Sequence, residues 1–258
     1  MMAQRIANVL RMEWAGMART PSSLLFLVVI PLLLIGQALF LAWILPAFLS
    51  PELAGIAPAG GENLDAVAQF RLLILEQFRF FILLIPAMIA NVFATLSIVE
   101  EKVSRTLEPL LATPVRTGEL LLGKVFAGAV PAIVVAWISA ALFVAFVALL
   151  GWGDLLTYVV SGSWYLSIFL LTPMISLLSF VVGVIGSSRA SDAKAAQNLA
   201  VLVVFPIFGV IIVQVTGLVW FTPLLTIWLS LGIAAVDAVL IRLAVRLFAR
   251  ESIVIRWR

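Results

Sequence analysis

Six long runs of apolar residues, separated by short polar segments, constrain the fold of this chain more than any other feature. A helix needs roughly 20 apolar residues to cross the hydrocarbon core of a bilayer. We therefore predict an all-α integral membrane protein with six transmembrane helices. The predicted spans cover residues 23–45, 78–99, 123–150, 163–187, 198–217 and 224–246. Prolines fall inside five of these runs, and we expect kinks at Pro31, Pro86, Pro131, Pro173 and Pro206.

Basic residues are distributed unevenly between the predicted loops. If the N-terminus lies in the cytoplasm, fourteen of the 16 Lys and Arg residues fall on the inner side, and only Arg71 and Arg79 on the outer side. Cytoplasmic loops of membrane proteins are enriched in Lys and Arg. We therefore expect a multi-pass protein of the plasma (inner) membrane with both termini in the cytoplasm. Five or seven spans would spoil this partition.

The composition excludes several classes of function. Apolar residues make up 64% of the chain and charged residues 11%, whereas a soluble domain carries about 25% charged residues. The chain has neither Cys nor His, so it lacks the thiolate nucleophile, the commonest general base and the commonest metal ligand. A membrane enzyme is therefore disfavoured, and we expect no cofactor on this chain. The net charge of +3 reflects membrane topology and does not indicate nucleic acid.

Two segments outside the spans show helical patterns. Residues 1–20 place apolar and basic side chains at helical spacing, so we predict an amphipathic interface helix on the membrane surface. The sequence is compatible with two roles for this segment, a simple membrane anchor and a docking element. Residues 63–77 follow a loop rich in Pro and Gly, and we predict a short outer helix there that leads into the second span.

The cytoplasmic segment of residues 100–122 carries features that an ordinary loop does not need. Its glutamates stand where topology favours basic residues: Glu100, Glu101 and Glu108. Its leucines follow an i, i+3, i+4 spacing that gives a short helix an apolar ridge: Leu107, Leu110 and Leu111. Pro114 then stops this helix. An exposed apolar ridge ringed by charges is what a helix needs to bind in the groove of another protein.

Two weak motifs have better explanations. Residues 118–125 nearly match the phosphate-binding loop, but Val125 replaces the magnesium-binding hydroxyl and no strand precedes the motif. We interpret this stretch as a helix that enters the membrane with Lys124 at the inner interface. Residues 151–154 resemble the Gly-x-Gly-Asp motif of intramembrane proteases, but no second carboxylate is paired with Asp154. We interpret them as a tight loop.

Polar residues inside the spans are candidates for a pathway. Asp237 lies within the last span, and Arg242, five residues later, is poorly aligned with it. We favour a structural polar contact for Asp237 over a substrate or proton site, with a water-filled cavity left open. Gln37, Asn91 and Gln214 are expected to face protein and not lipid. The possible pathway residues are thus Asn91, Gln214 and Asp237.

The cytoplasmic segment resembles the coupling segment of ABC-2-type transporter permeases. The matching positions carry the family's Glu-rich, Thr-Leu-Glu, Leu-Leu-x-x-Pro and Gly-Lys elements: Glu100, Glu101, Thr106, Leu107, Glu108, Leu110, Leu111, Ala112, Thr113, Pro114, Leu121, Gly123 and Lys124. Arg105 stands where the family usually has Gly. Residues 187–198 are similar to the inner loop before the fifth span of drug and sodium exporter permeases in this family. With both ends of the chain also fitting, the resemblance covers the whole sequence.

The resemblance implies that residues 1–258 form a single transmembrane domain, the permease subunit of an ATP-driven ABC exporter. A second permease chain, identical or different, would complete the pathway, and separate ATPase subunits would bind ATP and magnesium. The residues implied to contact the ATPase are Glu101, Arg105, Thr106, Leu107, Glu108, Leu110, Leu111 and Pro114.

A secondary transporter or channel without an ATPase partner is the alternative. It would rely on ionisable groups along a pathway, for which Asp237 and Glu76 are the candidates. In either case the apolar spans favour a lipophilic or amphipathic substrate, such as a drug or a lipid.

Overall fold

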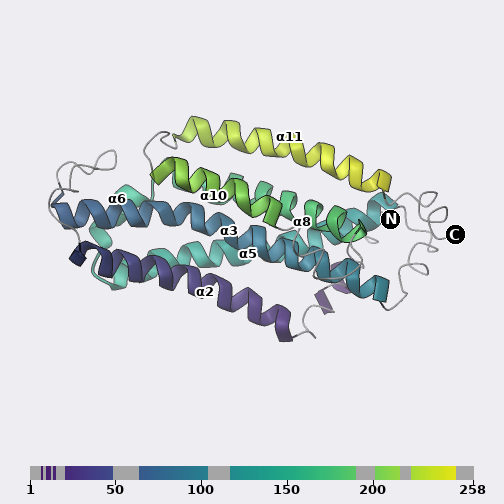
Figure 1. Cartoon of the computed structure of the whole chain (residues 1–258), viewed down its shortest axis with the longest axis horizontal. Helices are drawn as coiled ribbons and strands as arrows, with labels where there is room; N and C mark the ends of the chain where they lie inside the picture. The colour runs from purple at the N-terminus through teal and green to yellow at the C-terminus, as the bar shows by residue number, and fades with distance from the viewer. Residues whose placement is uncertain are drawn as a thin grey trace.

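The structure is a bundle of long helices that run alternately up and down (Figure 1). This computed structural model describes residues 7, 10–12, 14–15, 21–48, 64–103, 117–189, 201–215 and 222–247, and no strand occurs among them. The all-α prediction is therefore confirmed for this part of the chain. The long helices are α2 (Pro21–Ile44), α3 (Ala66–Val103), α5 (Thr117–Leu149), α8 (Thr172–Arg189), α10 (Val201–Val215) and α11 (Pro223–Leu247).

Short helical segments complete the path. The 3-10 segment η1 (Leu45–Phe48) follows α2, and η3 (Gly153–Leu155) leads into α6 (Leu156–Val159). Before α8 come α7 (Gly162–Leu166) and the π-helical segment η4 (Ser167–Leu171). The predicted tight loop after α5 is confirmed, because Gly151 adopts a φ of 78°, which a residue with a side chain rarely does.

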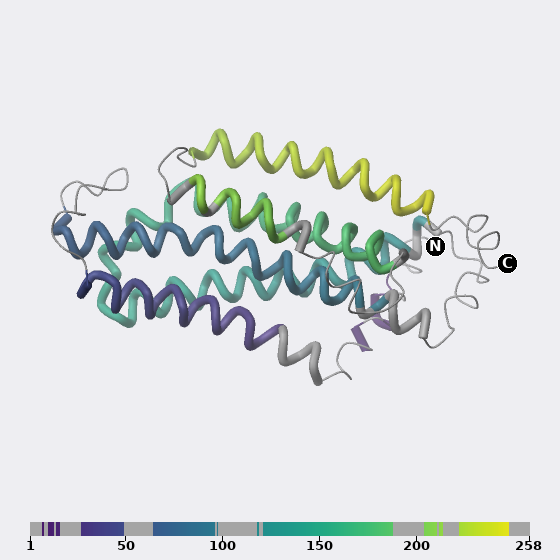
Figure 2. Tube along the Cα trace, in the orientation of Figure 1, coloured from purple at the N-terminus to yellow at the C-terminus, as the bar shows by residue number. Residues whose placement is uncertain are grey.

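Helix α3 lies at the centre of the bundle and contacts α2, α5, α8 and α10 (Figure 2). Its 38 residues would extend over roughly 57 Å, about twice the thickness of a bilayer core. The prediction that residues 63–77 form a helix leading into the second span is confirmed from residue 66 onward, since residues 66–77 continue into the span without a break. Pro86 lies inside α3 without ending it, as do Pro31 in α2, Pro131 in α5 and Pro206 in α10.

Within the described ranges, five segments are long and apolar enough to cross a membrane: Leu27–Phe48, Ala66–Thr95, Leu121–Leu149, Gly162–Ser187 and Pro223–Leu247. Helix α10 lies in the fifth predicted span, but its 15 described residues are fewer than a span requires. Each predicted span thus contains a helix, while a crossing by α10 stays a prediction.

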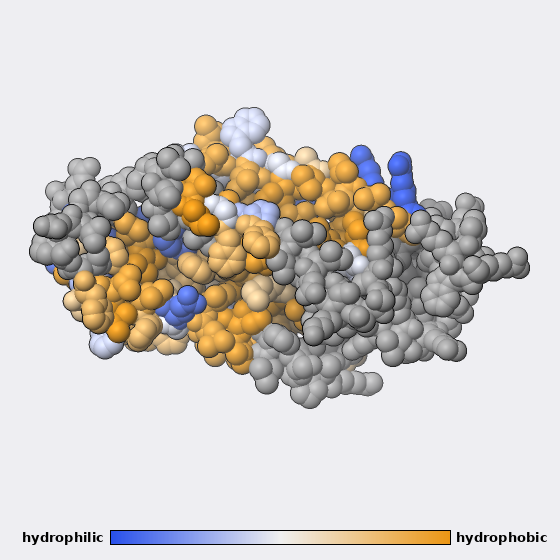
Figure 3. All heavy atoms as spheres, in the orientation of Figure 1, coloured by the Kyte–Doolittle hydropathy of each residue, from blue (hydrophilic) through white to orange (hydrophobic). Residues whose placement is uncertain are grey.

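On the face seen in Figure 3, the described surface between the two ends of the bundle is mostly apolar. Large side chains on the outward faces of α2, α5 and α11 are exposed, among them Leu33, Ile138 and Trp228. The last turns of α11 instead carry two exposed arginines, Arg242 and Arg246. An apolar belt with charges at its edge is the surface that a bilayer covers.

Helix α7, η4 and α8 form one continuous rod in which Pro173 imposes a local change of helix type. In the π-helical pattern Thr172 N donates to the Ser167 carbonyl. The next bond would run from residue 173 to the Ile168 carbonyl, but proline has no N–H. The indole Nε1 of Trp137 on α5 donates to that carbonyl instead, over 3.0 Å. A side chain from a neighbouring helix thus satisfies the group that proline leaves without a partner.

The end of the bundle at which α3 begins is tied together by Arg71 on α3. Its Nε donates to the Ala42 carbonyl of α2 over 3.2 Å, and its guanidinium lies 4.3 Å from the centre of the Trp152 ring. Within residues 1–20, the described residues are helical, and Trp14 Nε1 donates to the Ala127 carbonyl of α5 over 2.9 Å. The position of this segment on a membrane surface stays a prediction.

Candidate transport pathway and coupling segment

A row of polar side chains joins α3 to α8, and we call this row with its flanking glycines the α3–α8 seam. Asn91 Nδ2 donates to the Ser179 carbonyl over 3.4 Å and Asn91 Oδ1 accepts from Thr95 Oγ1 over 3.4 Å. The hydroxyl of Ser179 donates to the Ala87 carbonyl. All these side chains are buried. The prediction that Asn91 faces protein is therefore confirmed, and its possible role in a pathway stays a prediction.

Small residues let the helices of the seam approach closely. A Cβ built on Gly183 of α8 would lie 2.8 Å from the Cβ of Ala94 on α3. A Cβ built on Gly128 of α5 would lie only 2.1 Å from Cε2 of Phe180 on α8, a ring that is fully buried. Small residues at helix contacts are typical of membrane bundles, where close packing replaces the hydrophobic effect as the driving force.

The predicted coupling segment lies between the ends of α3 and α5. The ends of both helices beside it carry charged residues, α3 over residues 100–103 and α5 over residues 117–120, and we call these two ends the stalk. At its base Lys124 is buried, and its Nζ donates to Ser97 Oγ over 2.7 Å. Lys124 thus lies within the contact between α3 and α5, and its position at the inner membrane interface stays a prediction.

Most of the implied ATPase-contact residues lie outside the described residues. These are Arg105, Thr106, Leu107, Glu108, Leu110, Leu111 and Pro114. Glu101 is placed on the last turn of α3, and its side chain is outside the described part of the structure. Residues 118–125 lie within α5 and are helical, as predicted for a stretch that is not a phosphate-binding loop.

Helix α11 presents a polar face to the bundle and an apolar face outward. The buried residues of α11 are Thr226, Ser230, Asp237 and Ala244. The two hydroxyls donate to carbonyls of their own helical segment, Thr226 to Thr222 and Ser230 to Thr226. This arrangement reverses the pattern of a soluble helix, as expected for a helix in contact with lipid.

Asp237 is the exception on this face. Its side chain is 3% exposed, and within the described part of the chain neither carboxylate oxygen accepts a hydrogen bond. Arg242 is exposed. The structural polar contact that we predicted for Asp237 is therefore not found among the described residues. A buried carboxylate without a partner is costly, so it needs either a proton or a cation.

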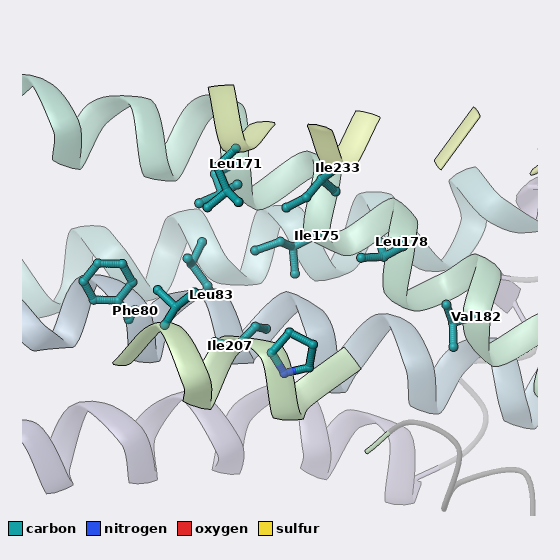
Figure 4. Close-up of a pocket in the computed structure, with 11 residues that line it drawn as sticks. Phe80, Leu83, Leu171, Ile175, Leu178, Val182, Ile207 and Ile233 are labelled. Atoms are coloured by element: carbon teal, nitrogen blue, oxygen red, sulfur yellow. The ribbon is translucent and has the colours of Figure 1, made fainter. Parts of the chain in front are cut away.

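An apolar pocket of about 370 Å³ opens between α3, η4, α8, α10 and α11. Figure 4 shows side chains from these elements converging on it. Every lining residue is apolar: Phe80, Leu83, Leu171, Ile175, Leu178, Val182, Pro206, Ile207, Val210, Leu229 and Ile233. Sequence reasoning missed this pocket, since each of these residues looks like an ordinary lipid-facing or core residue.

Gln37 and Gln214, the other two polar residues expected to face protein, lie in α2 and α10. Gln37 is exposed on the outward side of α2, next to the exposed Gly36, so it is not covered by the described part of this chain, and the prediction that it faces protein stays a prediction. Gln214 lies in α10, and its side chain is outside the described part of the structure. Asp154 is exposed in the loop after α5, as expected for a residue of a turn.

The comparison with known families agrees with this architecture. The family model described as ABC-2 family transporter protein matches residues 7–227, which include the N-terminal segment, the stalk and most of the helical bundle. None of the curated proteins compared with the chain matches it. Permeases of this family are membrane subunits of transporters and generally work with ABC ATPase subunits. The chain belongs to the ABC-2 transporter family.

Proposed function

We propose that this chain is the permease subunit of an ATP-driven exporter, which forms a translocation pathway with a second permease chain. Separate ATPase subunits bind ATP and magnesium. The exported substrate is lipophilic or amphipathic, such as a drug or a lipid. The observation that carries the proposal is the stalk, because the charged ends of α3 and α5 flank the predicted coupling segment at one end of the bundle.

The stalk suits the transfer of motion from an ATPase. Residues 104–116 connect two helices that are among the longest of the structure, and both helices pack against α8. The hydrogen bond between Lys124 and Ser97 ties them where the stalk begins. A displacement of the coupling segment would therefore be imposed on the centre of the bundle. In this proposal Leu107, Leu110 and Leu111 fill a groove on the ATPase, while Glu101, Arg105 and Glu108 contact its rim and Pro114 ends the coupling helix after Thr106 has begun it.

Charge supports a cytoplasmic position for the stalk. The exposed arginines Arg242 and Arg246 lie at the end of α11 on the same end of the bundle as the stalk (Figure 1). Arg71 and Arg79 lie on the first turns of α3, toward the opposite end. The positive-inside bias therefore favours a plasma (inner) membrane protein with the stalk and both termini in the cytoplasm.

An exposed polar residue within an apolar helix supports a second permease chain. Gln37 lies inside the apolar window of α2, and both Gln37 and Gly36 are exposed in the single chain. Lipid offers the amide no hydrogen-bond partner, while a second helix that packs over the glycine does. We infer that this face of α2 contacts the second permease chain.

Copurification tests the proposal. The chain, isolated from its native membranes in mild detergent, is expected to carry a stoichiometric ATPase. Leu110→Asp would place a carboxylate in the apolar groove at a cost of about 3 kcal/mol or more, which corresponds to a roughly 100-fold loss of affinity. Leu53→Asp makes the same change in the outer loop and is expected to leave the ATPase bound. A chain that purifies alone in every case, with its fold intact, would overturn the proposal.

One observation favours the alternative of a secondary transporter. Asp237 is a buried carboxylate near the middle of a membrane-spanning helix, and such groups often carry protons or ions through transporters. The alternative predicts that Asp237→Asn abolishes transport driven by an ion gradient. The exporter proposal predicts that transport follows ATP in the wild-type protein.

A further inference from the structure

The apolar pocket needs an occupant that is itself apolar. Its volume of about 370 Å³ falls in the range of pockets that hold drug-sized ligands. Water is a poor occupant, because an ordered water requires two or more polar partners and every lining residue is apolar. The lining lies well inside the apolar windows of α3, α8 and α11, at a depth that hydrocarbon reaches from the bilayer.

Asp237 continues the same face of α11 by which this helix lines the pocket. The lining residues Leu229 and Ile233 and the carboxylate of Asp237 are spaced at i, i+4 and i+8. At 3.6 residues per turn, Asp237 lies about one turn, or roughly 6 Å, beyond Ile233 and is rotated by only about 40° from it. Figure 4 shows Ile233 at the α11 side of the pocket.

The apolar pocket and the carboxylate of Asp237 favour complementary parts of one ligand. The pocket offers contact area without any polar group, while Asp237 is 97% buried and its oxygens accept no hydrogen bond from the described residues. A neutral hydrocarbon would satisfy the pocket and leave the carboxylate without a partner. An anion would be repelled by it. A cation with a large apolar body satisfies both at once.

We propose that the pocket and Asp237 together form a binding site for a hydrophobic cation, whose apolar body fills the pocket and whose charge lies against Asp237. This proposal rests on the proposed transport function and names the class of its substrate. Leu229, Ile233 and Asp237 on one helix then position the two parts of the ligand relative to each other.

Equilibrium binding to the purified full-length chain in phosphatidylcholine nanodiscs tests the role of charge. The probes are radiolabelled tetraphenylphosphonium and tetraphenylborate, which share a shape and differ in the sign of their charge. Tetraphenylphosphonium is expected to bind more tightly. Asp237→Asn is expected to weaken its binding by about tenfold or more, because a charge-assisted contact is lost. Asp154→Asn, at an exposed carboxylate, is expected to change nothing.

A second pair of variants tests the pocket. Ile233→Trp fills the pocket from α11 and is expected to weaken tetraphenylphosphonium binding by about tenfold or more. Leu231→Trp adds the same side chain on the exposed face of α11, where the leucine is 55% exposed, and is expected to leave binding unchanged. Thermal unfolding of each variant checks the fold, and Asp237→Glu, which keeps the charge, is expected to retain most of the affinity.

Three results would overturn the proposal. Equal binding of both ions that only Ile233→Trp weakens would show a pocket for hydrocarbon of any charge, such as a lipid tail. Binding that neither variant changes would show that the cation binds elsewhere or only in the nanodisc lipid. A folded wild-type chain that binds no tetraphenylphosphonium would exclude the site. Because none of these experiments uses ATP, their failure leaves the ATPase copurification test untouched, and the converse also holds.

Discussion

Helix α8 makes two contacts of opposite character. Toward α3 it presents Ser179 and Gly183, which allow close approach and hydrogen bonds. Toward α10 and α11 it presents Ile175, Leu178 and Val182, which leave a pocket of about 370 Å³. The first contact resists separation because hydrogen bonds would be broken in an apolar medium. The pocket between α8, α10 and α11 can take up or release a ligand without breaking hydrogen bonds, so this contact suits a binding site. The contact between α8 and α3 suits the transmission of motion from the stalk.

The largest change in stability is expected where a side chain is added to the tight contact between α8 and its other close neighbour, α5. Gly128→Leu would drive a side chain into the buried ring of Phe180, which other core residues hold in place. We expect a loss of about 3 kcal/mol in the free energy of unfolding, at the upper end of the usual range for overpacking. Detergent-based unfolding measures it. Gly209→Leu on α10 is the control, because a Cβ there meets nothing within 4 Å. Equal losses in both variants would contradict a tight contact between α5 and α8.

Replacing a buried polar side chain by leucine should change the free energy of unfolding in opposite directions next to the pocket and in the α3–α8 seam. Asp237→Leu is expected to raise the free energy of unfolding by about 2 kcal/mol, because a buried carboxylate near the middle of a membrane helix is costly. It should also abolish binding of the hydrophobic cation, as expected when function is maintained at the expense of stability.

Asn91→Leu is the counterpart on the α3–α8 seam. It removes two hydrogen bonds, so it should lower the free energy of unfolding by about 1 kcal/mol or more. The same unfolding assay measures both variants. If Asp237→Leu proved as destabilising as Asn91→Leu, the carboxylate would have a structural partner, and the contrast between the two regions would disappear.

The smallest effect is expected at the π-helical segment. Trp137→Phe keeps the aromatic ring and removes the donor to the Ile168 carbonyl. A single interhelical hydrogen bond in a membrane protein contributes about 0.6 kcal/mol on average. We expect a loss of this size for Trp137→Phe. In a Pro173→Ala background, where residue 173 can donate to Ile168, the loss should shrink. An unchanged loss in that background would show that the indole does not substitute for the missing N–H.

Much of the architecture could be predicted from the sequence. Apolar runs locate the helices because a bilayer core demands about 20 apolar residues whatever the tertiary contacts. Asp237 was recognised as exceptional for the same reason, since a carboxylate at that depth is costly in any fold. The coupling segment is predicted from a local pattern of leucines and glutamates, and most of it lies outside the described residues.

Properties that depend on neighbouring helices could not be predicted. Pro173 indicated a disturbance of the helix, but only the fold brings Trp137 to the Ile168 carbonyl. Gln37 and Asn91 are both single amides in apolar runs, yet one is exposed and the other lies in the seam. Whether each amide is exposed or buried depends on how its helix is oriented about its own axis, which the neighbouring helices determine. The pocket, formed by four long helices and η4, has no signature in any one of them.

The most direct test identifies the energy source that drives transport. The stalk predicts transport driven by ATP, whereas Asp237 alone would be compatible with transport driven by an ion gradient. Efflux of tetraphenylphosphonium from cells that contain this chain and its partners would be followed under two conditions. In one, cellular ATP is depleted and ion gradients are maintained; in the other, the gradients are collapsed and ATP is maintained. The account predicts that efflux stops in the first condition and continues in the second. Efflux that continues without ATP and stops when the gradients collapse would contradict it.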